Sequence, residues 1–266
     1  MIKIKPRIKF FLSSLLVFVS IGVYGQAEKS SFKFKTIVID AGHGGKDPGA
    51  HGSYSLEKDV ALAIAKKVQA LLSNETPGIT VIMTRTTDKF IPLNERSEIA
   101  NRNNANLFIS IHCNSSPEGT GSEHKGVLLL VYGFHRQQEQ MEALRENASI
   151  YIEKDYKKTY ARYNQDNPAN AIILNAVMHK YREQSILFGK ILNKEFTESD
   201  GRKSLGVKEQ GVLVLAHSAM PAVLVETGYI NNPDEEQYLN SEAGQNEIAD
   251  SIVRAIKAYR RQINVQ

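Results

Sequence analysis

The sequence has very little cysteine: Cys113 is the only one among 266 residues. No disulfide can form within the chain, and no cysteine lies at the N-terminal processing site where a lipid could be attached. The sequence also lacks internal repeats and low-complexity tracts. These absences exclude a small scaffold that is held together by disulfides.

The N-terminus lacks an apolar run of the length that a membrane span needs. The apolar stretch 10–23 is shorter than the roughly 20 residues of a transmembrane helix, and it is preceded by four basic residues, Lys3, Lys5, Arg7 and Lys9. This pattern, with small residues near Gly25, predicts a secretory signal peptide over residues 1–25. Cleavage after Ala27 is a close alternative, and a retained membrane anchor is the competing interpretation.

An excess of positive charge is also missing from the mature chain. Removal of residues 1–25 takes away four positive charges and no negative charge, so the formal net charge falls from +4 to about 0. We therefore expect no nucleic-acid partner and no stable membrane span once the signal is cleaved. Export without disulfides predicts a protein of the bacterial envelope, located in the periplasm.

The sequence does contain a regular alternation of strand and helix patterns over residues 26–266, with 42% hydrophobic residues in the chain. The alternation predicts an α/β fold, with a mixed, mostly six-stranded twisted sheet and helices on both faces. The expected strands are 36–40, 80–84, 107–111, 126–132, 212–215 and 222–225. The expected helices are 56–71, capped by Ser55, then 93–101 and 242–263.

Residues 134–185 do not fit this alternation. The segment is charged, rich in tyrosine and mostly helical in composition, and it is too long for an ordinary connection between two strands. We predict a helical regulatory insert within the catalytic domain, placed as a lid over the site. A surface decoration, or a wall of a substrate groove, is the simpler alternative.

Four polar residues lie next to short apolar runs: His43, Glu57, His112 and Glu226. Because ligands gather at the carboxyl ends of strands in open α/β sheets, we expect these side chains to meet at one edge. Two imidazoles and a carboxylate make a three-point zinc site with one position left for water. His43, Glu57 and His112 are the predicted zinc ligands.

Glu226 directly follows the apolar run 223–225. A carboxylate in such a position is costly to bury without a partner, and a metal site nearby would supply one. Since three zinc ligands are already assigned, Glu226 is predicted to be the general base.

Each of these residues also has a simpler explanation. The glycines around His43 could form a phosphate loop, but the lysine after them lacks the adjacent Ser or Thr. Glu57 could serve only to stabilise the first turn of a helix. Cys113 beside His112 could suggest a nucleophilic pair, but adjacent residues of a strand point to opposite faces. We therefore favour metal ligation.

Other polar residues are assigned to structural or surface positions. Four residues are expected to close loops and helix ends by hydrogen bonds: Arg85, Asp88, Arg96 and Asn101. The remaining histidines are expected to face solvent, and only the last could reach a substrate: His51, His124, His135, His179 and His217.

Several stretches, in this order, resemble the zinc-dependent N-acetylmuramoyl-L-alanine amidases of the third amidase type. They are IVIDAGHGGKDPGA, the Glu57 position, TRTTDKFIPLNERSEIANRNNANLFISIHCNSS and MPAVLVETGYINNPDEEQYL. The resemblance extends over residues 34–259, and four separated motifs make it specific. Enzymes of this family remove stem peptides from peptidoglycan during bacterial cell separation.

The resemblance implies a six-stranded sheet flanked by helices, one zinc ion on His43, Glu57 and His112, and a catalytic role for Glu226. It also implies that peptidoglycan is the substrate, cleaved between N-acetylmuramic acid and L-alanine. Residues 134–185 occupy the place where envelope amidases of this type carry an inhibitory helical insert. A carboxylate of the insert would then fill the open zinc position, and a LytM-type activator protein would displace it. Glu146 is the candidate carboxylate, with Glu142, Glu153 and Glu183 as alternatives.

Two other functions remain open from the sequence. A zinc peptidase that cuts within the stem peptide would use the same metal chemistry. An inactive wall-binding or regulatory protein could keep the fold, although Glu226 argues against this because a binding protein has no use for a general base.

Overall fold

The computed structural model describes residues 34–117, 123–133, 140–161 and 168–263, so the expected signal peptide lies outside the described residues. The strands are β1 Thr36–Ala41, β2 Thr80–Met83, β3 Leu107–Asn114, β4 Val127–Tyr132, β5 Ser204–Gln210 and β6 Ala222–Tyr229. The helices are α1 Glu57–Glu75, α2 Leu93–Arg102, α3 Met141–Asn147, α4 Tyr156–Thr159, α5 Pro168–Lys194, α6 Pro233–Asn240 and α7 Glu242–Ile263. Shorter turns are η1 Ala148–Ile152, η3 Glu195–Ser199 and η4 Leu213–Leu215. Of the described helices, none is long and apolar enough to cross a membrane.

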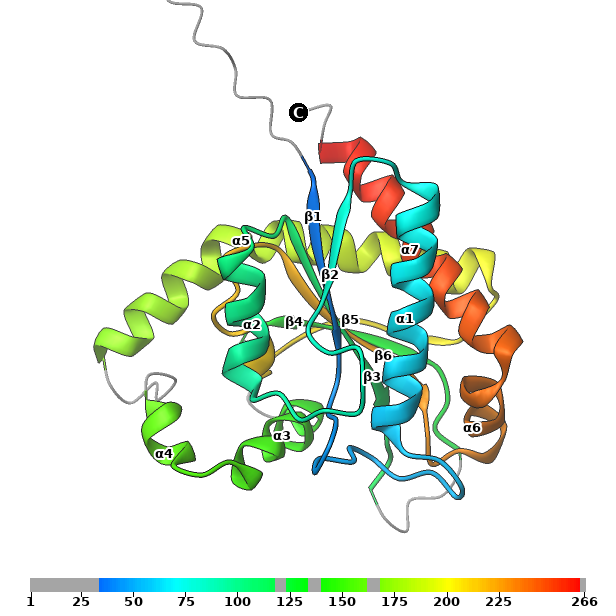
Figure 1. The fold of residues 1–266 in the computed structure, drawn as a ribbon, viewed down its shortest axis with the longest axis horizontal. Coiled ribbons are helices and arrows are strands. Elements are labelled where there is room, and N and C mark those ends of the chain that lie inside the picture. The colour runs from blue at the N-terminus through cyan, green and yellow to red at the C-terminus, as the bar shows by residue number, and fades with distance from the viewer. Residues whose placement is uncertain (1–33, 118–122, 134–139, 162–167, 264–266) are drawn as a thin grey trace, which may run out of the picture. The chain divides into compact units, whose positions relative to one another are not determined.

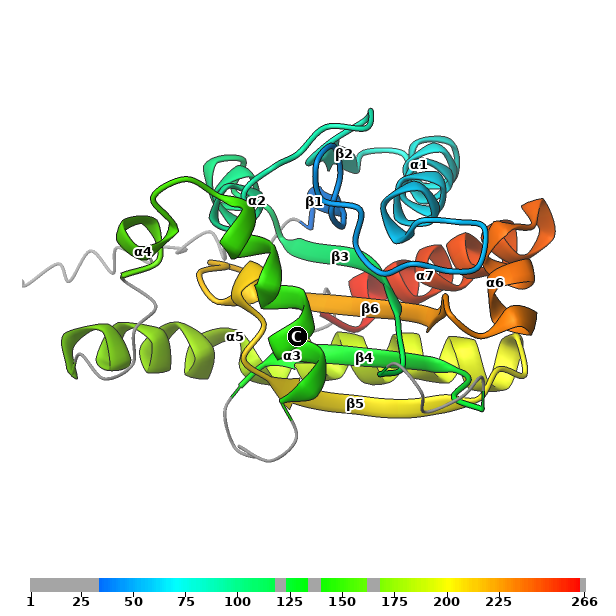
Figure 2. The ribbon, with the colours of Figure 1, turned by 90° about the horizontal axis from the view of Figure 1, so that it is seen from below.

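The six strands form one mixed sheet in the order β2-β1-β3-β6-β4-β5, which can be followed from top to bottom in Figure 2. Strands β2, β1, β3 and β6 are parallel to one another, whereas β4 is antiparallel to β6 and parallel to β5. The expected mixed six-stranded sheet is therefore confirmed. The carboxyl ends of β1, β3 and β6 lie at the same edge.

Helices cover both faces of the sheet because its strands are apolar on both sides. Ile39 and Ile109 belong to the core that packs against α1, α5 and α7. Val38 and Phe108, one residue earlier on the same strands, belong to the core beneath α2, α3 and η4, as the period of two along a strand requires. Figure 1 shows α1 and α7 on one side of the sheet and α2 and α3 on the other.

The expected strand over 212–215 is wrong. Its apolar side chains are buried, but in the turn η4, where they join the core on the α2 side of the sheet. The sixth strand is instead β5, whose sequence SLGVKEQ is polar and only partly buried because it pairs with β4 alone, at the edge of the sheet. An edge strand of this kind lacks the apolar run that marks a central strand.

The expected cap of the first helix is also wrong. Helix α1 begins at Glu57, its N-cap residue is Leu56, and no side chain caps it. Ser55 instead donates a hydrogen bond from Oγ to Glu236 Oε1 at 2.7 Å. The serine is used to join the loop before α1 to helix α6.

The segment 134–185 is mostly helical where it is described, with a non-helical turn over 153–155. It contains α3, η1, α4 and the first two thirds of α5, and its polar break over 164–167 lies outside the described residues. The expected end of the insert at Ser185 falls inside α5, which continues into the core through Phe188 and Leu192. Figure 1 places α3 at the end of the sheet where β1 terminates.

Candidate metal centre

The loop after β1 presents His43 with its backbone in the left-handed region, at φ 57°. Two buried arginines hold this loop: Arg96 donates from Nη2 to the carbonyl of His43 at 2.7 Å, and Arg85 donates from Nη2 to the carbonyl of Gly42 at 2.7 Å. A Cβ at Gly42 would lie 2.5 Å from the ring of His112, so only glycine allows this close approach. The structural roles expected for both arginines are confirmed.

Asp47 fixes the orientation of the His43 ring. Its Oδ2 lies 2.9 Å from His43 Nδ1 and also accepts a 2.7 Å hydrogen bond from Ser149 Oγ. Burial raises the pKa of Asp47, but these hydrogen bonds outweigh it and hold the pKa below its ordinary value. A carboxylate on one ring nitrogen leaves the other, Nε2, as the donor atom toward a metal. This role of Asp47 was not predicted from the sequence, although an acidic residue four positions after a candidate histidine ligand is a usable signal.

Glu57 lies in the first turn of α1 and is almost fully buried. Its Oε2 accepts a hydrogen bond from the backbone N–H of Ala50 at 2.7 Å, and its Oε1 accepts one from Cys113 N–H at 2.9 Å. Oε1 also lies 3.0 Å from His112 Nδ1. The carboxylate therefore faces the two histidines and does more than stabilise the start of a helix.

His112 and Cys113 point to opposite faces of β3, as expected. The Cys113 thiol is buried and its Sγ lies 3.5 Å from Thr227 Oγ1, in the core that packs on α1 and α7. His112 Nδ1 lies 2.8 Å from Glu146 Oε2. A Cys/His nucleophilic pair does not form in this arrangement.

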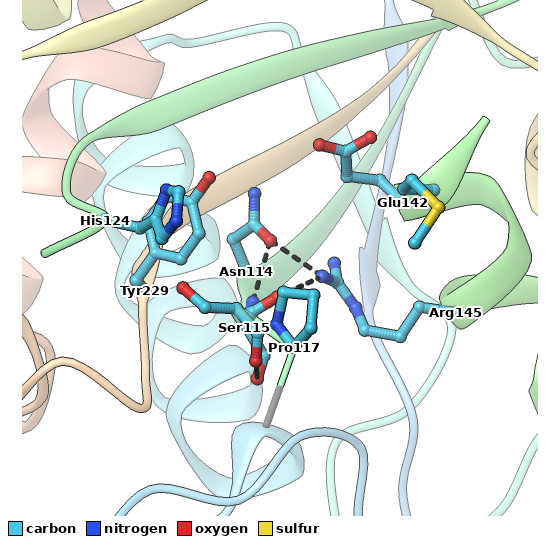
Figure 3. A pocket seen from close by; sticks show the side chains of 9 residues that line it. Asn114, Ser115, Pro117, His124, Glu142, Arg145 and Tyr229 are labelled. Carbon is cyan, nitrogen blue, oxygen red and sulfur yellow. Dashed lines mark hydrogen bonds between the residues drawn. The ribbon is translucent and has the colours of Figure 1, made fainter. Parts of the chain in front are cut away.

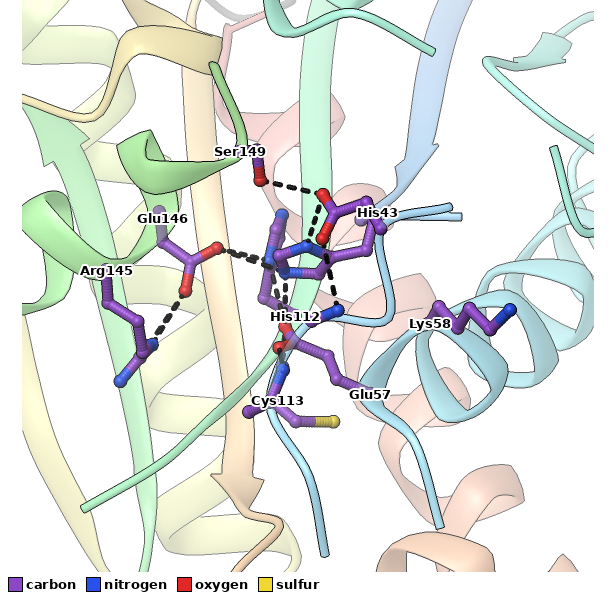
Figure 4. Close-up of polar contacts among 12 residues, drawn as sticks. His43, Glu57, Lys58, His112, Cys113, Arg145, Glu146 and Ser149 are labelled. Carbon is purple, nitrogen blue, oxygen red and sulfur yellow. Dashed lines mark hydrogen bonds and ion pairs between the residues drawn. The ribbon is translucent and has the colours of Figure 1, made fainter. Parts of the chain in front are cut away.

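The side chains of His43, Glu57, His112 and Glu146 bring four donor atoms within 4.8 Å of one another. The histidine-to-carboxylate separations run from 2.8 Å, for His112 with Glu146, to 3.3 Å, for His43 with Glu146 (Figure 4). Atoms that are each 2.0–2.1 Å from a tetrahedral zinc ion would be about 3.4 Å apart. His43 Nε2 and Glu146 Oε2 are buried and, apart from these ion-pair contacts, have no hydrogen-bond partner among the described residues. The donor set and its spacing fit zinc.

The electrostatics of the cluster also favour a cation. Burial raises the pKa of Glu57, but the neighbouring His43 outweighs this and lowers it to about 2. Burial lowers the pKa of His112, but the carboxylates of Glu146 and Glu57 raise it to about 9. The buried carboxylates therefore require positive charge beside them, which a divalent metal would supply.

Glu226 lies beside this cluster and is not one of its four residues. It is paired with His112 in the register of β3 and β6 and is fully buried. Burial raises the pKa of Glu226 to about 8, against the opposing effect of Arg145. Its Oε1 contacts Arg145 Nη2 at 2.6 Å, and its Oε2 has no hydrogen bond among the described residues.

Of the four carboxylates considered in the insert, Glu146 is the one that enters the cluster. The others lie elsewhere: Glu142 bonds with Gln210, Glu153 accepts a hydrogen bond from Tyr160, and Glu183 is exposed. Arg145 contacts both Glu226 and Asn114. These contacts were not predicted from the sequence because they depend on how the insert folds back.

The remaining expected positions are confirmed where they are described, apart from His217. Asp88 accepts a hydrogen bond from Gly45 N–H, and Asn101 binds the loop before β6. His51, His124 and His179 are exposed, and His135 lies outside the described residues. His217 is half-buried and precedes the start of β6, at the opposite edge of the sheet from the cluster, so it does not approach the site.

Comparison with known proteins identifies the family. Residues 37–258 match the family described as N-acetylmuramoyl-L-alanine amidase. The chain belongs to this amidase family. The amidase AmiA of Escherichia coli strain K12 is 32% identical over 237 residues, which cover 88% of this chain and 78% of AmiA.

Solved amidase structures share the fold. An N-acetylmuramoyl-L-alanine amidase from Clostridium difficile 630 matches with a TM-score of 0.62 and 26% identity, over 85% of this chain and 96% of that one. The CwlD amidase from Clostridioides difficile, solved in complex with the GerS lipoprotein, matches with a TM-score of 0.59 and 26% identity, over 85% of this chain and 98% of that one. The resemblance found in the sequence and the expected fold are both confirmed.

Proposed function

We propose that this member of the amidase family is a zinc-dependent N-acetylmuramoyl-L-alanine amidase that hydrolyses peptidoglycan during cell-wall remodelling and daughter-cell separation. His43, Glu57 and His112 would hold the zinc ion. The observation that carries the proposal is the convergence of their donor atoms beside the buried carboxylate of Glu226. Family membership supplies the substrate class.

In the proposed hydrolysis, the zinc ion and Glu226 have different roles. Zinc, when bound, acts as a Lewis acid that acidifies water and stabilises negative charge on a carbonyl oxygen. Glu226 accepts a proton from the attacking water and returns it to the leaving amine of L-alanine. Burial raises the pKa of Glu226 above its ordinary value, which strengthens this carboxylate as a proton acceptor. No covalent enzyme intermediate is needed.

The insert keeps this site closed in the described conformation. Glu146 adds a fourth donor to the three ligands, and Arg145 neutralises the carboxylate of Glu226. A LytM-type activator that binds the open arrangement more tightly would shift the population toward activity. The CwlD structure, solved with a lipoprotein, supports the idea that amidases of this fold bind partner proteins.

The location follows from the substrate. We place the mature chain, residues 26–266, in the periplasm after removal of a signal peptide over residues 1–25. Peptidoglycan lies in that compartment, and family membership supports it as the substrate.

The test is a digest of purified peptidoglycan, with and without a chelator, resolved by mass spectrometry. The full chain and its Glu146→Ala variant should both be assayed, because the closed insert lowers the rate. We expect stem peptides that begin with L-alanine and intact muramic acid, and none after chelation. Cuts within the stem peptide would identify a peptidase instead, and no cuts by either protein would leave only a binding role.

A further inference from the structure

A cavity of about 370 Å³ opens beside the candidate centre (Figure 3). One wall is the segment that follows β3, Asn114 to Pro117, and the facing wall is helix α3 with Arg145. The Tyr229 ring forms part of the lining, and His124 stacks on it with 5.7 Å between ring centroids. The volume lies within the usual range for a site that binds a small ligand.

Asn114 presents an amide at this cavity with only half of its hydrogen-bonding capacity used. The residue is 1% exposed. Its Oδ1 accepts hydrogen bonds from Ser115 N–H and Arg145 Nη1, both at 2.7 Å, and these two donors fix which way the amide points. Its Nδ2 is buried and has no hydrogen-bond partner among the described residues. An unpaired buried donor is costly, so an acceptor group of a ligand in the cavity would be stabilised there.

The guanidinium of Arg145 joins this amide to the candidate base. Nη2 contacts Glu226 Oε1 at 2.6 Å, while Nη1 contacts Asn114 Oδ1 at 2.7 Å and the carbonyl of Ser115 at 3.0 Å. One guanidinium group of the insert therefore binds the candidate base, at Glu226 Oε1, and two acceptors beside the cavity, Asn114 Oδ1 and the carbonyl of Ser115. In the proposed reaction, the N–H group that approaches Glu226 belongs to the leaving L-alanine.

We propose that Asn114 binds the second residue of the stem peptide, which follows L-alanine. Its Oδ1 accepts a hydrogen bond from the N–H of that residue, its Nδ2 donates to the carbonyl of the same residue, and the cavity holds the peptide that follows. Arg145 takes the place of these substrate N–H groups while the insert is closed. This inference rests on the proposed amidase function and adds a peptide subsite to it.

The chemistry of the cavity favours a peptide over a sugar. A carboxamide pairs its acceptor and donor with the N–H and carbonyl of one extended residue, which lie on the same side of the chain. Asn114 offers this pair once Arg145 withdraws from Oδ1. The cavity also lies next to Glu226, which the leaving amine of L-alanine approaches in the proposed reaction. It would therefore receive the stem peptide, which departs with that amine. The glycan, on the other side of the scissile carbonyl, would lie away from Asn114.

The test compares two substrates that differ by this residue. The full chain carrying Arg145→Ala and Glu146→Ala is the parent protein, and Asn114→Ala and Asn114→Asp are added to it. The substrates are N-acetylmuramoyl-L-alanine, which lacks the second residue of the stem peptide, and N-acetylmuramoyl-L-alanyl-D-isoglutamine, which has it. We expect Asn114→Ala to lower kcat/KM for the longer substrate about 10- to 100-fold, mainly through KM, because two hydrogen bonds are lost. Cleavage of the shorter substrate should change less than about 2-fold, and Asn114→Asp should lie between the two because it keeps the acceptor.

An equal loss for both substrates would show that Asn114 is only structural and would overturn the proposal. Zinc content and the thermal unfolding midpoint of each variant show whether the centre and the fold are intact. Binding provides a readout that does not depend on catalysis: calorimetric titration of the parent with L-alanyl-D-isoglutamine should show binding that Asn114→Ala weakens at least about tenfold. Unchanged binding would overturn the subsite. A parent that binds the dipeptide through Asn114 but cleaves neither substrate would contradict the proposed function and leave the subsite standing.

Discussion

Arg145 of helix α3 forms an ion pair with Glu226 of strand β6, with 2.6 Å between Nη2 and Oε1. The next residue along the chain, Glu146, contacts the histidines of the candidate metal centre. Two consecutive residues of one short helix therefore occupy the candidate base and the candidate fourth ligand position together. Movement of α3 would release both at once.

Loss of a proposed ligand should remove zinc. We expect His112→Ala to bind zinc much more weakly than the wild type, and His43→Ala and Glu57→Ala to behave alike, since each removes one of three protein ligands. Zinc content after dialysis, measured by atomic emission, checks this. The exposed His51 offers a matched control, because His51→Ala should keep one zinc ion per chain. Full retention of zinc in all three ligand variants would rule out the assignment.

Asp47 should act on the metal through His43. Asp47→Asn keeps the size of the side chain but weakens its hold on the His43 ring, and loss of such a partner typically lowers metal affinity about 10- to 100-fold. Competition with a chromogenic zinc chelator measures the affinity. Equal affinity in wild type and variant would show that the contact does not orient the ligand.

Glu226→Gln should separate metal binding from catalysis. The variant keeps the size of the side chain but cannot accept a proton, and removal of a general base typically costs about 10²–10⁴-fold in rate. We expect normal zinc content and a rate lowered by that factor. If more than about a tenth of the wild-type rate remained, another residue would have to be the base.

Opening of the insert should raise the basal rate. Glu146→Ala removes the carboxylate from the cluster, so hydrolysis of purified peptidoglycan by the zinc-loaded full chain should increase several-fold or more. Glu183→Ala is the control, because Glu183 is exposed on α5 and its removal should leave the rate unchanged. If Glu146→Ala and its double variant with Arg145→Ala fold, bind zinc and are no faster than wild type, α3 only shapes a groove.

Glu236 should make the fold sensitive to acid. Burial raises the pKa of Glu236, but hydrogen bonds from Ser53, Tyr54 and Ser55 outweigh this and lower it from 4.5 to about 2. Because the pKa is lower in the folded protein than in the unfolded chain, this stabilisation is complete above about pH 5 and is lost as the pH falls toward 2. Glu236→Gln should lower the free energy of unfolding by about 2 kcal/mol at pH 7, and the difference from wild type should shrink below pH 4.

Denaturant unfolding at pH 7 and pH 3 measures this difference. Glu75→Gln is the matched control, because Glu75 forms a surface ion pair with Lys257 and such pairs contribute about 0–1 kcal/mol. A constant difference between Glu236→Gln and wild type across both pH values would contradict the assigned role of Glu236.

The sequence alone predicted the central strands and the four polar residues beside them because both rest on local patterns. His112 and Glu226 each end an apolar strand run, and parallel strands bring such ends together. Strand β5 was missed because it is a polar edge strand, and the turn η4 was mistaken for a strand because its buried side chains look the same in sequence. The contacts of Arg145 with Glu226 and Asn114 could not be predicted, since they arise where a long insert folds back onto strands that are remote in sequence.

The position of the bond that is cut tests the central claim most directly. Zinc-loaded Glu146→Ala should hydrolyse a purified muropeptide in water enriched in the heavy oxygen isotope, with the products analysed by mass spectrometry. The amidase reaction predicts that the heavy oxygen enters the lactyl carboxylate of muramic acid and that the released peptide, beginning with L-alanine, carries none. Heavy oxygen in a carboxylate of the stem peptide, with muramic acid still joined to L-alanine, would contradict the account.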